Sequence, residues 1–226
     1  MGARRRRYTD ADVDVPAQRP DAPPRVVLAS ASPRRADLLR QIGLLFEVWT
    51  GAAEAEVWGA SADGPDGGGR WTRDAVRAQA QRRAEDKARL AAATYPDAVV
   101  IAADTMVAVD GVVLGKPRSP DDAAAMLCRL SGRAHDVTTA VAVVHARRGI
   151  GLVDASTTRV VFRPLRRHEI HRYVATGEPM DKAGAYGIQG RAALFVERVE
   201  GDYFGVVGLP LALLGRLLEA AGVPPL

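Results

Sequence analysis

Strand-like and helical segments alternate from residue 25 to the end of the chain, and this alternation limits the fold more than any other feature. Short apolar or β-branched runs predict strands at 25–29, 46–49, 98–102, 137–146, 152–162, 194–199 and 203–207. Helical periodicity or composition predicts helices at 33–42, 72–93, 119–132, 165–175 and 209–221. We therefore expect an α/β or mixed α+β fold, in which a central mixed β-sheet is flanked by helices.

Turn and capping residues mark the ends of several elements. The pair Asp110-Gly111 is typical of a tight hairpin turn and predicts a hairpin over 106–114. Ser32 and Ser119 stand at expected helix N-caps, each followed by a proline. Gly43 stands where the first helix would stop. We expect the runs 194–199 and 203–207 to form a further hairpin.

Two polar stretches interrupt the pattern. Residues 1–24 lack hydrophobic periodicity and predict a disordered tail, and 59–70 (GASADGPDGGGR) predicts a flexible inserted loop, which leaves one domain over 25–226. The tail contains an arginine run at 4–7, but its five positive side chains nearly balance its four negative ones. We therefore do not expect nucleic acid as a partner, although the arginine run alone could contact phosphates.

The sequence also argues against disulfide and membrane chemistry. Its one cysteine, Cys128, excludes an internal disulfide, and its place in an apolar pattern predicts buried packing. No apolar run reaches the ~18 residues of a membrane span, and no signal-type apolar segment follows the early arginines. By elimination we expect a cytoplasmic protein without a membrane partner.

The segment Ser30 to Arg35, SASPRR, lies where the first predicted strand turns into the first predicted helix. Exposed N–H groups at a helix N-terminus attract anions, and two adjacent arginines would add bidentate donors for phosphate. An ordinary capped helix with two solvated arginines explains the same residues. This segment alone leaves both interpretations open.

Asp104 follows the apolar run 98–102, so we expect it at the carboxyl end of that strand, where open sheets bind ligands. A carboxylate there can hold Mg²⁺ or Mn²⁺, or deprotonate water. A turn-capping aspartate supported by the Thr105 hydroxyl is the alternative. The hairpin that follows would bring Lys116 back beside Asp104.

The segment 177–190, GEPMDKAGAYGIQG, places small residues among polar ones. Gly184 and Gly187 would let the backbone approach a ligand closely. The amide of Gln189 carries both a donor and an acceptor, which is what reading the edge of a base requires. A tight surface crossing needs the same residue types, so this alternative stays open.

Six segments, in order, resemble the Maf family of nucleotide pyrophosphatases. They are LASASPRRADLL (28–39), AEDKA (84–88), IAADTMVAVDGVVLGKP (101–117), MLCRLSGRAHDVTTAV (126–141), GEPMDKAGAYGIQG (177–190) and GDYFGVVGLPL (201–211). The resemblance covers about 25–221 and implies the elongated Maf-like fold with a ligand cleft.

The resemblance implies hydrolysis of a nucleoside triphosphate at the α–β phosphoanhydride, giving monophosphate and pyrophosphate with a divalent cation, Mg²⁺ or Mn²⁺. By their places in the motifs, Asp104 matches the proton acceptor and a metal ligand, and the phosphate-binding side chains correspond to Ser30, Arg34, Arg35, Lys87 and Lys116. Arg34, Thr105 and Gln189 are similar to the dTTP/UTP-specific branch. Glu54 matches the family's acidic metal ligand only if one residue is deleted before it.

The resemblance therefore predicts a house-cleaning enzyme that removes dTTP, UTP or modified pyrimidine nucleotides, and it leaves a homodimer open. Two alternatives remain. One is the same reaction with a broader or different base specificity. The other is a protein that binds nucleic acid or regulates cell division, for which the arginine run at 4–7 is the distinctive support.

Overall fold

A mixed β-sheet runs through the computed structural model, which describes residues 24–51 and 70–224. Within these residues the strand order is β2-β1-β3-β5-β6-β7, with β4 paired to β3. The strands are β1 (Val26–Ala29), β2 (Glu47–Trp49), β3 (Val99–Val109), β4 (Val112–Leu114), β5 (Ala134–His145), β6 (Ile150–Phe162) and β7 (Val196–Glu200). The pairs β1–β2 and β1–β3 are parallel and the other pairs are antiparallel, so the predicted mixed sheet is confirmed.

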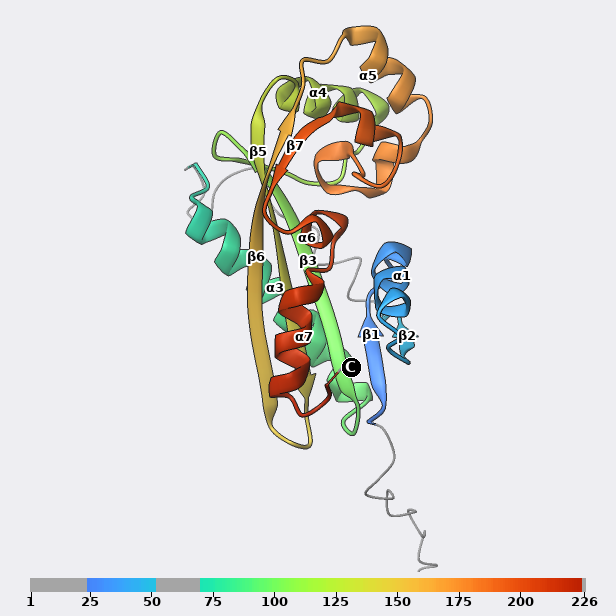
Figure 1. Cartoon of the computed structure of the whole chain (residues 1–226), viewed down its shortest axis with the longest axis vertical. Helices are drawn as coiled ribbons and strands as arrows, with labels where there is room; N and C mark the ends of the chain where they lie inside the picture. The colour runs from blue at the N-terminus through green and yellow to red at the C-terminus, as the bar shows by residue number, and fades with distance from the viewer. Residues whose placement is uncertain (1–23, 52–69, 225–226) are drawn as a thin grey trace, which may run out of the picture.

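Helices cover both faces of this sheet. Figure 1 shows α3 behind the long strands, α6 and α7 in front of them, and α4 and α5 gathered at one end of an elongated molecule. The α-helices are α1 (Pro33–Gln41), α3 (Arg73–Thr94), α4 (Pro120–Leu130), α5 (Arg167–Val174), α6 (Tyr203–Val207) and α7 (Leu211–Ala220). Three short 3₁₀ segments complete the upper end: η1 (Glu178–Asp181), η2 (Ala183–Ala185) and η3 (Arg191–Phe195).

The helix α3 packs on the sheet through a row of alanines. Ala80, Ala84 and Ala88 are fully buried, and their small side chains let the helix axis come close to β3 and β5. The first turn is capped by Thr72, whose hydroxyl accepts a hydrogen bond of 3.2 Å from the Ala75 N–H. The sheet-facing side of α3 thus carries little side-chain volume, which leaves room for two long cationic side chains described below.

The strand β3 separates the two apolar clusters of the core. Val100 and Met106 belong to the cluster that includes the α3 alanines, whereas Ile101 and Val107 belong to the larger cluster that includes Leu214 and Phe162. Because successive side chains of a strand point to opposite faces, Asp104 lies on the α3 side and Thr105 on the other. The side chains of these two consecutive polar residues therefore lie on opposite faces of the sheet.

Asp104 lies inside β3 and not at its carboxyl end, so the predicted end of that strand is wrong. β5 pairs with β3 from Val100↔Val144 to Ala108↔Asp136, and Asp104 itself pairs with Ala140. The apolar run ends at Ala103, but the backbone ladder with β5 continues to Ala108. Pairing with a distant strand therefore decides the length of β3, not the local hydrophobic pattern.

Two further expectations are corrected. Residues 203–207 form the helix α6 and not a strand, because the Asp202 side chain caps the turn by accepting a hydrogen bond of 3.1 Å from the Gly205 N–H. Cys128 is exposed on α4 and not buried, because the buried face of that helix is made by Ala123, Leu127 and Leu130. The predicted caps and turns of α4 and of the 106–114 hairpin are confirmed.

Candidate active site

A cavity of about 270 Å³ lies where β3 passes between the ends of two neighbouring strands. β3 pairs with β1 over Val99–Ile101 and with β4 over Val107–Val109, so Asp104 and Thr105 fall between these two ladders. The cavity is lined by every described residue that the sequence predicts for the site: Ser30, Arg34, Arg35, Lys87, Asp104, Thr105, Lys116 and Gln189. The other expected metal ligand, Glu54, lies outside the described residues, as do the predicted tail and most of the inserted loop.

Asp104 is held by cations from α3. Its Oδ1 accepts a hydrogen bond of 2.6 Å from Lys87 Nζ, and the two side chains are only 4% and 5% exposed. Arg83, one helical turn before Lys87, places Nη1 3.9 Å from Asp104 Oδ2. The sequence motifs do not include Arg83, but its i, i+4 spacing from Lys87 is a signal that would have placed it on the same helix face.

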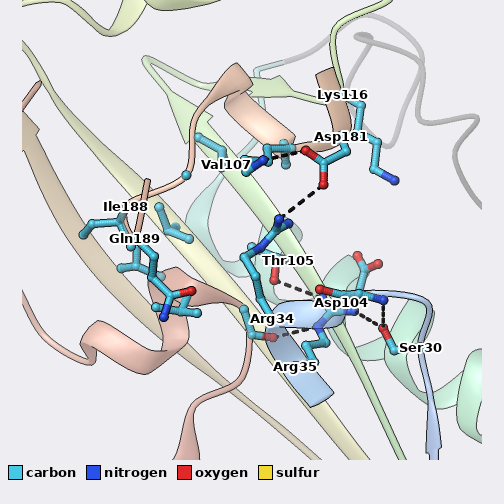
Figure 2. A pocket seen from close by; sticks show the side chains of 18 of the residues that line it. Ser30, Arg34, Arg35, Asp104, Thr105, Val107, Lys116, Asp181, Ile188 and Gln189 are labelled. Carbon is cyan, nitrogen blue, oxygen red and sulfur yellow. Dashed lines mark hydrogen bonds and ion pairs between the residues drawn. The ribbon is translucent and has the colours of Figure 1, made fainter. Parts of the chain in front are cut away.

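Arg35 links three parts of the chain around the cavity. Its Nε donates to the Gly208 carbonyl at 2.8 Å, Nη1 donates to Ser30 Oγ at 3.0 Å, and Nη2 donates to Thr105 Oγ1 at 3.2 Å. Thr105 also shares a hydrogen bond of 2.9 Å with Thr139 on β5. The guanidinium therefore ties α1 to β3 and to the turn between α6 and α7, as Figure 2 shows for Ser30 and Thr105.

The start of α1 differs in one detail from the sequence expectation. Ser32 occupies the N-cap position, but its side chain makes no capping hydrogen bond. Its backbone N–H donates to Ser30 Oγ at 3.2 Å, so the buried Ser30 hydroxyl orders this turn. Pro33 begins the helix as expected, and Gly43, with φ of 72°, follows its end. The turn presents the N-terminus of α1 to the cavity.

Arg34 reaches across the cavity to the segment that contains η1. Its Nη1 lies 3.2 Å from Asp181 Oδ2, and Lys182 Nζ lies 2.5 Å from the other oxygen, Oδ1. Burial alone would raise the pKa of Asp181, but hydrogen bonds and charge from Lys182 and Arg34 outweigh burial and hold the pKa below its ordinary value. Asp181 and Lys182 line the cavity, and they are two of the charged side chains that the sequence places in the segment 177–190.

The opposite part of the cavity is apolar. It is lined by Val107, Val137, Tyr186, Ile188, Val206 and Val207. The Gly184 backbone has φ of +70°, and a Cβ added there would lie 2.9 Å from Val107 Cγ1. Gly184 is thus required by packing against β3, which differs from the expected close approach to a ligand. The cavity combines a cationic part with an apolar wall, as a charged ligand with a flat ring system would require.

The side chains of the cavity suit a divalent cation that is bound mainly by oxygens of a second bound molecule and of water, and only in part by the protein. Within residues 24–51 and 70–224, no group of three or more His, Cys, Asp and Glu side chains could hold a metal ion. Asp104 Oδ2 is buried and has no hydrogen-bond partner among these residues, and a carboxylate oxygen is a donor that Mg²⁺ and Mn²⁺ prefer. One such oxygen suits a cation whose remaining ligands are phosphate oxygens and water.

The comparisons with known proteins agree with one another. The family model described as Maf-like protein matches residues 25–221. A dTTP/UTP pyrophosphatase of Moorella thermoacetica is 51% identical over 88% of this chain and 96% of its own length. The dTTP/UTP pyrophosphatase of Symbiobacterium thermophilum is 48% identical over 88% of this chain and 95% of its own length. None of the described helices is long and apolar enough to cross a membrane.

Proposed function

The chain belongs to the Maf family, and from this premise we propose that it hydrolyses dTTP, UTP or modified pyrimidine analogues to the nucleoside monophosphate and pyrophosphate. The observation that carries the proposal is one cavity that gathers Asp104 with Arg34, Lys87 and Lys116, which come from four different elements or connections. A triphosphate carries up to four negative charges, and its hydrolysis requires positioning and charge neutralisation more than covalent chemistry.

In the proposed reaction, Asp104 accepts a proton from a water molecule that attacks the α-phosphorus. The bond from the α-phosphorus to the bridging oxygen breaks, and pyrophosphate leaves with that oxygen. The Lys87 ammonium, 2.6 Å from Asp104 Oδ1, fixes the orientation of the carboxylate. Arg34 and Lys116 bind phosphate oxygens, and the N-terminus of α1 adds backbone donors. Arg35 and Ser30 order the same turn through their hydrogen bond.

We further propose that Mg²⁺ or Mn²⁺ takes part. Asp104 Oδ2 would be its protein ligand, and Glu54 stays a predicted second ligand. When bound, the cation supplies positive charge to the phosphate oxygens. The domain limits at 25–226, the cytoplasmic location and a homodimer also stay predictions.

The test of the reaction is pyrophosphate release from dTTP with Mg²⁺, by wild type and by Asp104→Asn. We expect turnover to fall by ~10²-fold or more, because the proton acceptor is lost. Asp136→Asn is the matched control: this carboxylate also lies on the sheet and accepts a hydrogen bond of 2.7 Å from Arg73 Nε, but it does not line the cavity. Equal turnover of folded Asp104→Asn and wild type would remove Asp104 from the reaction.

The base specificity is tested by comparing dTTP, UTP, CTP and 7-methyl-GTP. We expect wild type to prefer dTTP and UTP, and Gln189→Ala to lose that preference more than it loses turnover, because the amide would read the base edge. Gln41→Ala, at the exposed end of α1, is the control. A wild type without preference would support the alternative of broader specificity.

The nucleic-acid alternative depends on the arginine run at 4–7, which lies outside the described residues. Deletion of residues 1–24 separates it from the enzyme. We expect hydrolysis of free nucleotides to persist in the truncated protein, and loss of hydrolysis would contradict that expectation.

A further inference from the structure

The apolar wall of the cavity is held by a pair of side chains from distant parts of the sequence. Tyr186 lines the cavity, and its Oη shares a hydrogen bond of 2.8 Å with Nε2 of His135 on β5. The two rings meet edge to face with their centroids 5.4 Å apart, and both contact the Phe162 ring in the same way. This contact joins residues separated by 51 positions.

The segment that carries Tyr186 has little regular structure to fix its shape. It contains the three-residue η2, in which Gly184 and Ala185 have φ of 70° and 60°. A non-glycine residue in this left-handed region costs free energy and persists only where the surroundings impose it. Contacts with other elements therefore hold the segment just before Ile188 and Gln189, which line the cavity. They are the bond of Tyr186 to the sheet and the bond of 3.3 Å that the Gly187 N–H donates to Tyr173 Oη on α5.

His135 supplies the first of these contacts from a rigid element. It is 2% exposed and pairs with Val160 on β6, and Val137, two residues further along β5, lines the cavity. Since alternate residues of a strand share a face, the imidazole lies under the same wall. The Tyr186 hydroxyl is thus fixed to the sheet and not to another loop.

Packing alone does not account for a histidine at this position. Among the described residues Nδ1 of His135 has no hydrogen-bond partner, and leaving a buried polar atom unsatisfied costs free energy. Burial lowers the pKa of His135 to about 4, so the ring is neutral and does not act as an acid at neutral pH. A phenylalanine would fill the same space without that cost. What distinguishes the imidazole is its bond to the Tyr186 hydroxyl.

We propose that His135 and Tyr186 are positioning residues that set the base specificity of the cavity by fixing the segment 183–189 and its Gln189 amide. This inference rests on the proposed function. Lys87 donates to Asp104 on the α3 face of the sheet, whereas His135 shares the other face with Val137, so we assign the pair to nucleotide selection and not to the chemical step.

The test compares UTP and CTP as substrates of wild type, Tyr186→Phe, His135→Phe and the double variant. Tyr186→Phe removes only the hydroxyl. We expect the ratio of kcat/KM for UTP over CTP to fall at least about threefold, with KM raised and kcat for UTP within about twofold of wild type. The double variant replaces the polar pair by two apolar rings, and we expect it to recover stability without recovering the ratio. Tyr203→Phe is the control, because that ring is 43% exposed on α6 and does not line the cavity.

The outcomes separate the two proposals. A wild type that hydrolyses no nucleotide overturns the proposed function, and the specificity proposal falls with it. An active wild type whose Tyr186→Phe variant keeps the UTP to CTP ratio overturns the positioning role alone, even if the variant unfolds at a lower temperature. A loss confined to kcat, with KM and the ratio unchanged, also overturns it.

Discussion

Replacing the lysine that pairs with the buried carboxylate should lower the stability of the fold as well as the rate of the reaction. In Lys87→Met, the Asp104 carboxylate, 4% exposed, would lose the ammonium 2.6 Å from its Oδ1. Loss of one partner of a buried ion pair costs about 3–5 kcal/mol, because the remaining charge stays desolvated. Arg83, 3.9 Å from Oδ2, offsets part of this cost, so we expect the lower end, about 3 kcal/mol. For a chain of this size that corresponds to a fall of about 6–12 °C in Tm.

The measurement is a double-mutant cycle by urea unfolding of wild type, Lys87→Met, Asp104→Asn and the double variant. We expect the double variant to lose less free energy of unfolding than the two single variants lose in sum, because neither charged partner of this ion pair remains in it. The exposed pair of Arg40 and Asp37 on α1, 62% and 71% exposed, is the control cycle and should show little coupling. If each single variant lost less than about 1 kcal/mol of unfolding free energy and the two losses were additive, the pair would behave as a solvated ion pair. That result would refute the reasoning.

Three other perturbations follow from the fold. Gly184→Ala should lower the free energy of unfolding by at least about 1 kcal/mol, because it places a Cβ in the left-handed region 2.9 Å from Val107 Cγ1. In a urea titration, adding Val107→Ala should restore part of the lost free energy. A double variant that shows no recovery would contradict this contact. The His135 pKa falls from 6.5 to about 4 on folding, so below pH 6.5 the unfolded chain binds a proton that the folded chain does not, and about 3 kcal/mol of stability should be lost between pH 6.5 and about 4. His135→Phe should lack this loss when the free energy of unfolding is measured against pH. The same pH dependence in wild type and variant would show that His135 is not its source. Cys128→Ser should change the free energy of unfolding by less than about 0.5 kcal/mol, because the side chain is exposed. The wild-type thiol should also react with a thiol reagent in the folded protein. A thiol that does not react would contradict its exposed position.

Local signals predict the elements that local chemistry decides. The cap, proline and acidic first turn of α4 stand in a row in the sequence, and the Ser119 hydroxyl indeed accepts a hydrogen bond of 3.1 Å from the Asp122 N–H. The hairpin turn at Asp110-Gly111 likewise depends on two neighbouring residues with positive φ. These features need no information from the rest of the chain, so neighbouring residues predict them correctly.

The features that local sequence patterns do not predict depend on partners far along the chain. The length of β3 follows from β5, which begins 25 residues after β3 ends, and the hydroxyl of Tyr186 meets an imidazole from that same strand. Arg83 needs the fold of α3 over β3 before it comes near Asp104. The expected site residues other than Glu54, which lies outside the described residues, line one cavity. The order of whole motifs along the chain predicts this set, because each single segment also allows a simpler interpretation.

On the edge away from β5, the described residues give β3 no strand partner between its ladders with β1 and β4, and unpaired strand edges can pair with other chains. Arg34, Arg35 and Lys116 stand around it, and charged side chains are a usual protection for an edge. We therefore expect the same cations that suit a polyphosphate to protect this edge from pairing with other chains. We expect a variant in which all three are neutral to be less soluble, so its precipitation would not by itself show that it fails to bind nucleotide.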